Sequence, residues 1–514
     1  MNEVNELKHK NKTKESASSF FLFALMLFMF SPFAGINSMI GMAGDTCMQI
    51  KLGLDDIAAG KLITEEIYSW HPDLVFTAHE SGWYLLLGIV YKFFKLWGVI
   101  AVGAFFIYST GIIAVRYMKD KAHPLICALV IGLTPMLQGY PDYNVRPSLT
   151  SSLAVPLLIV SFLNRRKPLF KAGLFSVSCL FLAWVQGGIL PLFLSVYVVL
   201  IVIELLYRNY KEVPILLCGI PAGFLLSLLN PAGYRILTFG LTQSSATDIW
   251  ALVDEWTPMN FTILQALLIL LVFVGFMCSG KVRSFEKRYI TELALFCMFF
   301  IMTCVYKRFV LYLSIAFLMF APELFEEIIK WAYDVVFKLK RKVSLKLSDS
   351  FYTLLGGACI VMLIGLGVFY TGRYLPTGTM SDIEKMAAYD PQAVEFIKNE
   401  GYEKVFNSFD TGSWLVFHGV KVHIDNRIDP FMSEFSPEDH IRGQMNVSSL
   451  ADLDAFRGRY NNDAFLVNMG EGYSYLLYEI EEYAPSRYRV VYDNTVQSVI
   501  PGVGATRWVV IECT

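Results

Sequence analysis

Residues 188–207 read GILPLFLSVYVVLIVIELLY, and Glu204 is the only charged residue among them. A run of about 20 apolar residues matches the thickness of the hydrocarbon core of a membrane. Arg208 and Lys211 follow this run directly, as basic residues commonly do at the ends of membrane spans. The whole chain is 55% hydrophobic and 17% charged, with a mean hydropathy of +0.48. These values are far from those of soluble domains and predict an α-helical integral membrane protein.

Similar apolar runs recur along the chain and predict about 11 transmembrane helices. The predicted spans are residues 19–40, 97–115, 122–138, 147–163, 169–185, 188–207, 212–229, 263–280, 289–305, 309–328 and 351–371. When they are threaded in order, the clusters of Lys and Arg between them and the lysines of the N-terminus all fall on one side. The positive-inside bias makes that side cytoplasmic, so we expect a multi-pass protein with a cytoplasmic N-terminus.

Three segments are then expected on the outer side. They are a first loop at 41–80, a second loop at 230–262 and a tail at 372–514, beyond a transmembrane domain at 1–371. The stretch from Trp83 to Trp97 is apolar and aromatic, which favours a helix that lies in the membrane interface.

The tail has the alternating character of a small α/β domain. Helices are expected at Pro391–Gly401 and Tyr475–Tyr483. Strands are expected at Val405–Asn407, Trp414–Phe417, Val422–Asp425, Phe465–Val467, Tyr488–Tyr492 and Trp508–Ile511. The tail is large enough to be an extracytoplasmic domain of its own.

Composition and motifs exclude several classes of function. The net charge of −2 gives no indication of nucleic-acid binding. The sequence has no P-loop, no HExxH and no GxSxG, so nucleotide hydrolysis and serine-type acyl transfer lack support. No Cys/His spacing suits a metal, so no metal site and no required cofactor are predicted, and a divalent cation lacks support. Cys47 and Cys513 are the cysteines expected outside the membrane, and the sequence does not decide whether they pair.

The most informative feature is a set of polar residues that all fall where a predicted span meets the outer face. Polar and ionisable groups at membrane depth are costly, so their convergence marks a working site. The set comprises Asp45, His79, Glu80, Arg146, Gln186, Asn230, Asp254, Glu255 and Arg308.

Asp45 and two arginines carry the chemical hypothesis. A carboxylate at the depth of Asp45 can accept a proton from a hydroxyl nucleophile, although a solvated or helix-capping Asp fits the position too. Arg146 and Arg308 lie on the side that the charge bias otherwise empties of cations. With Lys307 they suit an anionic phosphate, and the alternative is interfacial snorkelling.

Further residues of this set suit a sugar or an acceptor. The pair His79-Glu80 near Trp83 can bind a hydroxyl, orient a base or hold a cation, and a helix cap is the plainer alternative. Gln186 and Asn230 lie beside Gly and Pro residues that also end helices. The stretch Asp254-Glu255-Trp256 combines two acids with an aromatic plane, which suits sugar stacking, or is ordinary loop chemistry.

A second polar cluster, Asp425-x-Arg427-x-Asp429, lies at a predicted strand end in the tail. It either binds an acceptor glycan or holds a structural ion pair at a turn, and we favour the ion pair.

The spacing of these pieces resembles the GT-C superfamily of membrane glycosyltransferases, which use polyprenyl-phosphate sugars. The resemblance is to the branch of protein O-mannosyltransferases and lipid A aminoarabinose transferases. Its residues are Asp45 at the opening of the first loop, His79-Glu80-Ser81-Gly82-Trp83 at its close, Arg146-Pro147, Trp184 to Gly188, Asn230-Pro231 and Glu255-Trp256. The tail resembles the exported domain of bacterial GT-C-like proteins through Pro391 to Ile397, Val405 to Asn407, Thr411 to Leu415 and Val422 to Arg427.

This resemblance implies a glycosyltransferase of the bacterial cytoplasmic membrane. It implies that Asp45 is the base that deprotonates an acceptor hydroxyl, and that the sugar is transferred with inversion. Arg308, Lys307 and Arg146 would hold the phosphate of a polyprenyl-linked donor. The acceptor would be a glycan, a lipid or a protein. Two other functions stay open at this point, a transporter or flippase of a lipid-linked substrate and a catalytically inactive assembly protein.

Overall fold

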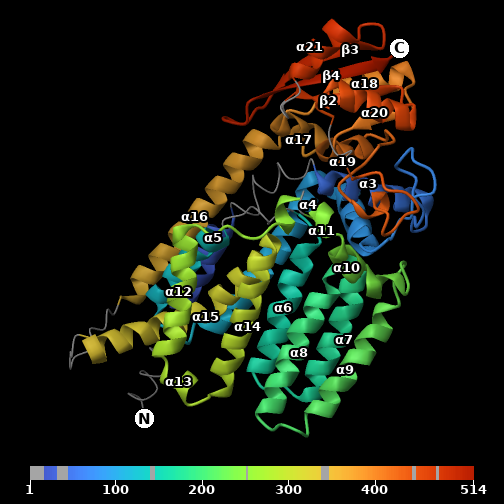
Figure 1. Cartoon of the computed structure of the whole chain (residues 1–514). Helices are drawn as coiled ribbons and strands as arrows, with labels where there is room; N and C mark the ends of the chain where they lie inside the picture. Colours follow the sequence, from blue (N-terminus) through green and yellow to red (C-terminus); the bar gives the residue numbers. More distant parts are fainter. Residues whose placement is uncertain are drawn as a thin grey trace.

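The computed structural model describes residues 17–31, 44–138, 145–250, 253–336, 347–442, 447–469 and 474–514. It consists of a long helical body and a small α/β domain at one end of that body (Figure 1). We call the end of the body that carries this domain the loop face. Predicted residues that fall in the gaps, such as 41–43 of the first loop and 251–252 of the second, lie outside the described residues.

A helix overlaps each of the predicted spans. These helices are Ala17–Phe30, α4 (Ser81–Met118), α5 (Pro124–Gln138), α6 (Ser148–Leu163), α7 (Pro168–Val185), α8 (Leu190–Leu206), α9 (Val213–Ser227), α12 (Ile263–Cys278), α14 (Lys287–Val305), α15 (Val310–Trp331) and α16 (Asp349–Tyr374). Six of the helical segments are long and apolar enough to cross a membrane, and the others are shorter. A helical, multi-pass membrane protein is thus confirmed, whereas the figure of 11 crossings and their orientation stay predictions.

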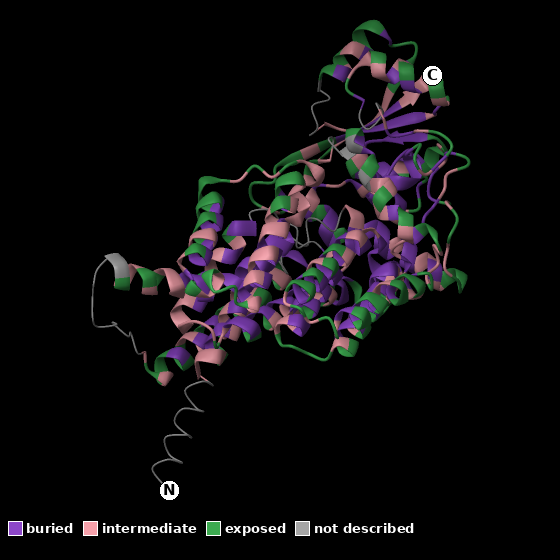
Figure 2. Cartoon of the chain, turned by 60° about the horizontal axis from the view of Figure 1, so that its bottom comes forward, coloured by how far each residue is buried: buried purple, intermediate pink, exposed green. Residues whose placement is uncertain are grey.

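The distribution of burial explains how this body suits a membrane. Helix α15 lies at the centre of the body. In its most apolar 18-residue stretch 78% of the residues are buried, compared with 17% in the corresponding stretch of α16. α16 runs along the outside of the body to the C-terminal domain (Figure 1) and exposes Leu354, Val361 and Val368. Buried residues gather inside the body and exposed ones outside it (Figure 2). Apolar side chains on the outside of a helical body are expected where lipid is the solvent.

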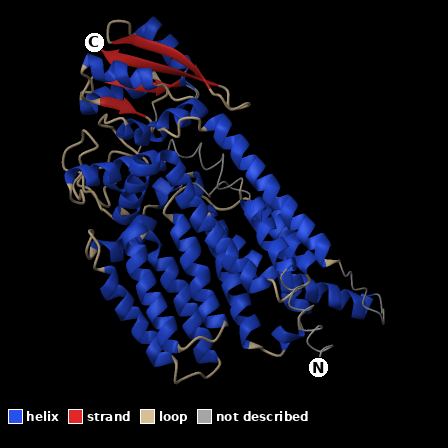
Figure 3. Cartoon of the chain, turned by 180° about the vertical axis from the view of Figure 1, so that it is seen from behind, coloured by secondary structure: helices blue, strands red, loops and turns tan. Residues whose placement is uncertain are grey.

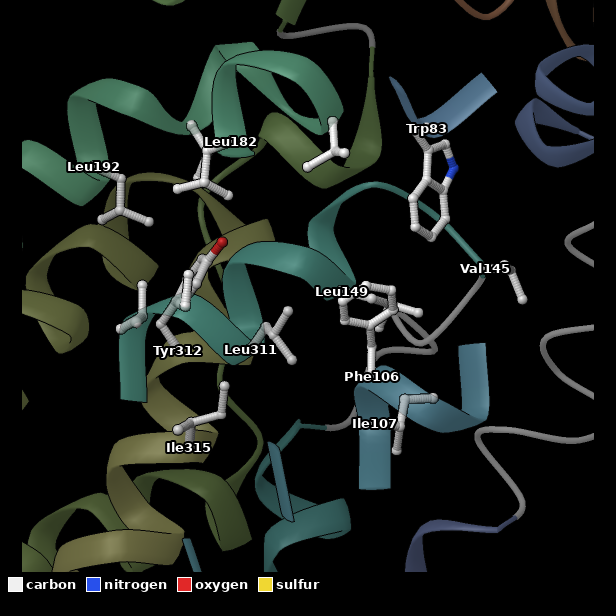
Figure 4. Close-up of a cluster of buried hydrophobic side chains, with 14 of the residues drawn as sticks. Trp83, Phe106, Ile107, Val145, Leu149, Leu182, Leu192, Leu311, Tyr312 and Ile315 are labelled. Carbon is white, nitrogen blue, oxygen red and sulfur yellow. The ribbon is translucent and has the colours of Figure 1, made fainter. Parts of the chain in front are cut away.

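Side chains from five helices form the centre of the body near the loop face (Figure 4). The labelled residues are Trp83, Phe106 and Ile107 of α4, Val145 and Leu149 at the start of α6, Leu182 of α7, Leu192 of α8, and Leu311, Tyr312 and Ile315 of α15. All are 6% exposed or less. This packed layer supports the elements that lie above it.

The predicted interfacial helix and the span after it form one element, α4. The element is broken at Lys95, whose φ of 56° and ψ of −150° are not helical. Trp97, beyond the break, is 41% exposed, but Trp83 is fully buried. The interfacial position of this stretch stays a prediction, but Trp83 itself is covered by protein and does not contact lipid. The reason is that α3 (Asp45–Ala59) covers this end of α4, and Trp83 Nε1 donates to Gln49 Oε1 of α3 at 3.0 Å.

Two glycines let α3 and α4 approach closely. A Cβ atom on Gly53 would lie 1.8 Å from the backbone oxygen of Tyr84, and one on Gly88 would lie 2.3 Å from the carbonyl carbon of Gly53. The chain therefore needs the smallest residue at both positions, and this contact holds Asp45 and Gln49 of α3 above the centre of the body.

Short helices complete the loop face and the opposite end. At the loop face lie the 3₁₀ turn η2 (Gly187–Ile189), α10 (Arg235–Ser245), α11 (Thr247–Trp250) and the 3₁₀ turns η3 (Asp254–Trp256) and η4 (Lys307–Phe309). Helix α13 (Gly280–Arg283) lies at the other end (Figure 1). The π-helical segment η5 (Ala332–Val336) continues α15.

The C-terminal domain contains one mixed sheet with the strand order β1-β2-β4-β3 (Figure 3). Its elements are α17 (Met380–Ala387), α18 (Pro391–Glu400), β1 (Val405–Asn407), α19 (Phe409–Phe417), η6 (Asp429–Phe431), α20 (Leu450–Tyr460), β2 (Ala464–Asn468), α21 (Ser474–Tyr483), β3 (Tyr488–Gln497) and β4 (Ala505–Cys513). β1 pairs with β2 in parallel, and β4 pairs with both β2 and β3 in antiparallel. The predicted α/β domain is confirmed.

Two predicted strands of this domain are wrong. Trp414–Phe417 belongs to α19, because a short apolar run fits a buried helix as well as a strand. The segment Val422–Asp425 forms no ladder, and Val422 makes only a single parallel bridge with Ser69 of the first loop. Cys47 and Cys513 form no disulfide with each other.

Candidate functional site

A cavity of about 420 Å³ lies where the loop face meets the C-terminal domain. Its polar part is built by α3, the turn at 79–80, the turn at 186–189, the start of α6, α10, η3, η4 and the turn at 426–428. Its apolar part is built by α8, α14 and α15. The polar lining residues include Asp45, Gln49, His79, Glu80, Arg146, Gln186, Gln243, Glu255, Arg308, Asn426 and Arg427.

Two carboxylates and two arginines form a continuous chain of charges along the polar wall. Arg146 Nε lies 3.0 Å from Asp45 Oδ2, and Arg146 Nη1 donates to Glu255 Oε2 at 2.9 Å. Arg308 Nη1 lies 3.8 Å from Glu255 Oε1, and its guanidinium lies 4.3 Å from the centre of the Trp256 ring. The predicted base and the predicted phosphate-binding arginines therefore lie side by side.

The charge state of the two carboxylates differs with their surroundings. Burial raises the pKa of Asp45 and the charges of Glu255, Glu80 and Asp425 raise it further, while Arg146 opposes the shift. Burial also acts to raise the pKa of Glu255, but Arg146 and Arg308 outweigh it and hold this pKa below its usual range. Asp45 is therefore the better proton acceptor of the two, since a base works best when its pKa approaches the working pH.

His79 and Glu80 form a second polar group on the same wall. His79 Nε2 lies 3.6 Å from Glu80 Oε1, and Nδ1 is 2.8 Å from the backbone oxygen of Thr77, which makes Nδ1 the donor. The imidazole stacks on Phe239 of α10, with ring centres 4.0 Å apart. Burial lowers the pKa of His79, but the contact with Glu80 and the charge of Asp429 outweigh burial and raise it to about 9. His79 is therefore a cation at neutral pH.

The C-terminal domain contributes a tight turn to the cavity wall. Asn426, Arg427 and Ile428 line the cavity, and Ser413 Oγ donates to Asn426 Oδ1 at 2.9 Å. Ile428 has a φ of 64°, a strained conformation for a β-branched residue. Such strain persists only where the surroundings fix the backbone firmly, and it is common at functional sites.

Arg427 supplies that firm fixing. Its guanidinium donates to Glu66 Oε2 at 2.6 Å and to Glu66 Oε1 at 3.0 Å, and also to Asp425 Oδ2 at 2.6 Å. The three side chains are at most 3% exposed. The ion pair favoured from the sequence is thus confirmed, and it extends to the first loop through Glu66.

Asp429, the third member of that sequence cluster, has no such partner at Oδ2. Its side chain is buried, and this oxygen has no hydrogen-bond partner. Burial raises the pKa of Asp429 to about 7, against the opposing charges of His79 and Arg427.

The structure brings most of the predicted site residues to the cavity but not all of them. The lining includes Asp45, His79, Glu80, Arg146, Gln186, Glu255, Trp256 and Arg308. Asp254 is not in the lining and pairs with Lys307 at 2.6 Å, with its side chain 66% exposed.

Trp83 and Asn230 also lie away from the lining. Trp83 packs beneath Gln49, as described above. Asn230 closes the turn after α9, where its side chain donates to the backbone oxygen of Gly233 at 3.3 Å and accepts from Ala232 N at 2.7 Å.

Several lining residues carry no signal in the sequence. Gln49 and Tyr84 lie within helices, and Phe239 belongs to an ordinary amphipathic stretch. Asn426 lies inside the cluster at 425–429, but only the packing of the domain on the loop face shows that it borders the cavity. No group of three or more His, Cys, Asp or Glu side chains suited to a metal ion occurs within the described ranges.

Apolar side chains of the helical body complete the lining of the cavity. Leu192, Ile301, Val305 and Leu311 are among them. Ile301 is 60% exposed and Val305 is 49% exposed, so α14 leaves apolar surface uncovered at this part of the site. The cavity therefore combines a charged wall with an apolar one.

Comparisons by sequence find no match, either to a family model or to a curated protein. A comparison of structures finds the archaeal oligosaccharyltransferase AglB of Archaeoglobus fulgidus, in complex with an inhibitory peptide and a dolichol-phosphate. That match has a TM-score of 0.52 at 10% identity and covers 96% of this chain and 74% of the other. The chain therefore shares its overall fold with this oligosaccharyltransferase.

A second match is the oligosaccharyltransferase of the same organism tethered to an acceptor peptide that contains the NVT sequon. It has a TM-score of 0.49 at 12% identity and covers 96% of this chain and 74% of that one. At 10% identity the likeness to AglB concerns the fold alone.

Proposed function

We propose that this chain is a glycosyltransferase that moves a sugar from a polyprenyl-phosphate donor to an acceptor hydroxyl at the outer face of a bacterial cytoplasmic membrane. The observation that carries this proposal is the joined arrangement of Asp45, Arg146 and Arg308 in one cavity that also has an apolar wall. A lipid-linked phosphate sugar has the same division, with a charged head and an apolar chain.

The arginines suit the phosphate of the donor. A guanidinium presents planar donors that match phosphate oxygens, and two of them can offset the charge that develops on a leaving phosphate. Arg308 is held against Trp256 and Arg146 against Asp45, so both are positioned before they act. Lys307 lies beside Arg308 but pairs with Asp254 outside the lining of the cavity. Lys307 therefore acts on the phosphate only through its charge, from a distance.

Asp45 suits the role of base. Its oxygen accepts the proton of the acceptor hydroxyl while that hydroxyl attacks the anomeric carbon from the face opposite the phosphate, which inverts the configuration. The bond to the phosphate oxygen breaks, and the electron pair leaves with the phosphate. General-base catalysis of this kind contributes about 10²–10⁴-fold in rate.

The remaining polar wall suits the sugar and the acceptor. Glu80 and Gln186 offer hydrogen-bonding groups for hydroxyls, His79 offers a cation, and Trp256 offers an aromatic face. In AglB a dolichol-phosphate is bound in a protein of the same fold, which supports a lipid-linked donor in general terms.

The test compares cell-envelope glycans and glycolipids by mass spectrometry in a deletion strain restored with wild type or with Asp45→Asn. The control is Asp55→Asn on the same helix, whose carboxylate pairs with Lys51 at 2.6 Å outside the cavity. We expect one sugar-sized mass difference to vanish in the deletion and with Asp45→Asn and to persist with Asp55→Asn. Full restoration by Asp45→Asn at equal membrane abundance would contradict the proposal and favour a transport or assembly function.

A further inference from the structure

The carboxylate of Glu255 lies where a phosphate would be expected in this site. Its two oxygens face two different arginines, Oε2 towards Arg146 at 2.9 Å and Oε1 towards Arg308 at 3.8 Å. A phosphate held by the same pair would present two oxygens in the same way. We propose that Glu255 is a built-in substitute for the donor phosphate, which neutralises the two arginines before the donor binds and is displaced by the donor. This inference rests on the proposed function, because it takes the arginines to be the phosphate site.

The balance of charge requires such a displacement. Arg146 and Arg308 supply two positive charges, and Asp45 and Glu255 supply two negative charges, so the cluster is neutral as it stands. A phosphodiester between the arginines would add a negative charge to a balanced, partly desolvated set, and like charges at this distance repel. If the phosphate takes the place of Glu255, each guanidinium keeps an anionic partner and the repulsion is avoided.

The arginines are held so that they remain in place when Glu255 leaves. Arg146 keeps its ion pair with Asp45 at 3.0 Å, and Arg308 keeps its contact with the ring of Trp256. When Glu255 leaves, the two arginines lose only the carboxylate that bridges them, and the phosphate then bridges them in its place. The site is therefore preorganised for an anion without any movement of its cations.

The backbone at Glu255 is also fixed, so the change is confined to the side chain. The turn η3 is tied to η4 by a hydrogen bond from Lys307 N to the backbone oxygen of Thr257 at 2.8 Å, and by the ion pair of Lys307 with Asp254. A rotation about the side-chain bonds of Glu255 is enough to free both guanidinium groups. The side chain is 21% exposed, which leaves it room to turn towards the cavity.

The consequence is a selection for charge. An uncharged polyprenol cannot replace the Glu255 carboxylate and has to bind beside an arginine pair that is already neutralised. A polyprenyl phosphate replaces the carboxylate with an anion of at least equal charge. Glu255 thus discriminates phosphorylated lipids from the corresponding alcohols, at the expense of some affinity for the phosphate itself.

The test measures binding of farnesyl phosphate and of farnesol to the purified full-length protein in detergent by calorimetry. We expect Glu255→Gln to tighten farnesyl phosphate binding by about fivefold, which corresponds to about 1 kcal/mol, and to leave farnesol binding unchanged. Glu255→Asp, which is one methylene shorter, should also tighten it because it cannot bridge both arginines. Asp248→Asn is the control, since it removes the same charge from an exposed pair with Arg442.

The other outcomes separate this inference from the proposed function. If Arg308→Gln weakens farnesyl phosphate binding but both Glu255 variants weaken it too or leave it unchanged, Glu255 is a permanent support for the arginines. The inference is then overturned and the proposed function stands. If wild type binds farnesyl phosphate no better than farnesol and Arg308→Gln has no effect, the arginines are not a phosphate site and both proposals fail.

Discussion

Among side chains outside the predicted spans, that of Arg427 should be one whose removal lowers stability most. It joins the turn at 425–429, which borders the cavity, to Glu66 of the first loop. Its own side chain is 2% exposed, that of Glu66 is 3% and that of Asp425 is 0%. The perturbation we consider is Arg427→Met, which keeps an unbranched side chain as far as the position of Nε and removes the guanidinium with its charge and its hydrogen bonds.

The expected magnitude follows from what the substitution leaves behind. Arg427→Met leaves two carboxylates buried and facing each other without a cation. Removal of one partner from a buried ion pair costs about 3–5 kcal/mol. Glu66→Gln is milder, because the pair of Arg427 with Asp425 survives and an amide oxygen can still accept from the guanidinium. We expect about 1–2 kcal/mol for that change.

The assay measures local opening of the contact between the first loop and the C-terminal domain, which we call the joint, and not unfolding of the whole protein. Hydrogen exchange is measured at two amides whose hydrogen bonds cross this joint, Trp70 N to Val422 O at 3.3 Å and Val422 N to Tyr68 O at 3.0 Å. A loss of about 3 kcal/mol corresponds to exchange about a hundredfold faster at both amides. The control is Arg489→Met, which breaks an ion pair with Glu512 in which the arginine is 67% exposed. Exposed pairs contribute about 0–1 kcal/mol, so exchange at the joint should not change.

A small effect would refute this reasoning. If Arg427→Met accelerates exchange at Trp70 and Val422 by less than about threefold, the buried charges do not hold the first loop to the domain. A second check is the double variant with Glu66→Gln. Because both changes act on one network, their combined cost should be smaller than the sum of the separate costs.

Two further predictions concern stability. Burial raises the pKa of Asp429 from an ordinary value of 3.8 to about 7, so the contribution of this group to folding stability is fully present below about pH 4 and is lost as the pH rises towards 7. Asp429→Asn should therefore raise the melting temperature at pH 8 and leave it unchanged at pH 4, and equal shifts at both pH values would contradict this. Gly53→Ala should destabilise the protein by at least about 2 kcal/mol, because the new methyl group would overlap the backbone of α4. Gly357→Ala on α16 is the control, since nothing lies within 4 Å of its added Cβ, and equal melting temperatures for the two variants would contradict the packing argument.

The sequence was sufficient to locate the long apolar helices of the body. A run of apolar residues such as 188–207 has to lie in a helix if it lies in lipid, because each backbone N–H and C=O must then be paired within the segment. The apolar run alone is enough to predict this helix, so no knowledge of other segments is needed. Residues beside span ends, such as Asp45 and Arg308, could likewise be selected from the sequence because charge is rare there.

The tertiary structure decided what those residues contact. Arg146 and Glu255 are 109 positions apart, and their ion pair depends on how η3 packs over the start of α6. The sequence could not separate Glu255, which lies between two arginines, from its neighbour Asp254, which points outward. Tertiary packing decides which distant residues a side chain contacts, and the local periodicity of the sequence does not reveal that packing.

Burial was the second property that only the structure decided. Trp83 resembles an interfacial tryptophan in the sequence, yet α3 covers it completely because Gly53 and Gly88 allow the two helices to touch. Asn426 has no distinguishing feature in the sequence, yet it borders the cavity because Arg427 fixes the turn against the first loop. The sequence by itself determined where the long apolar helices lie and which residues are costly to place at a membrane face. The tertiary contacts determined which of them share one cavity, since ion pairs and close helix packing join segments that are distant along the chain.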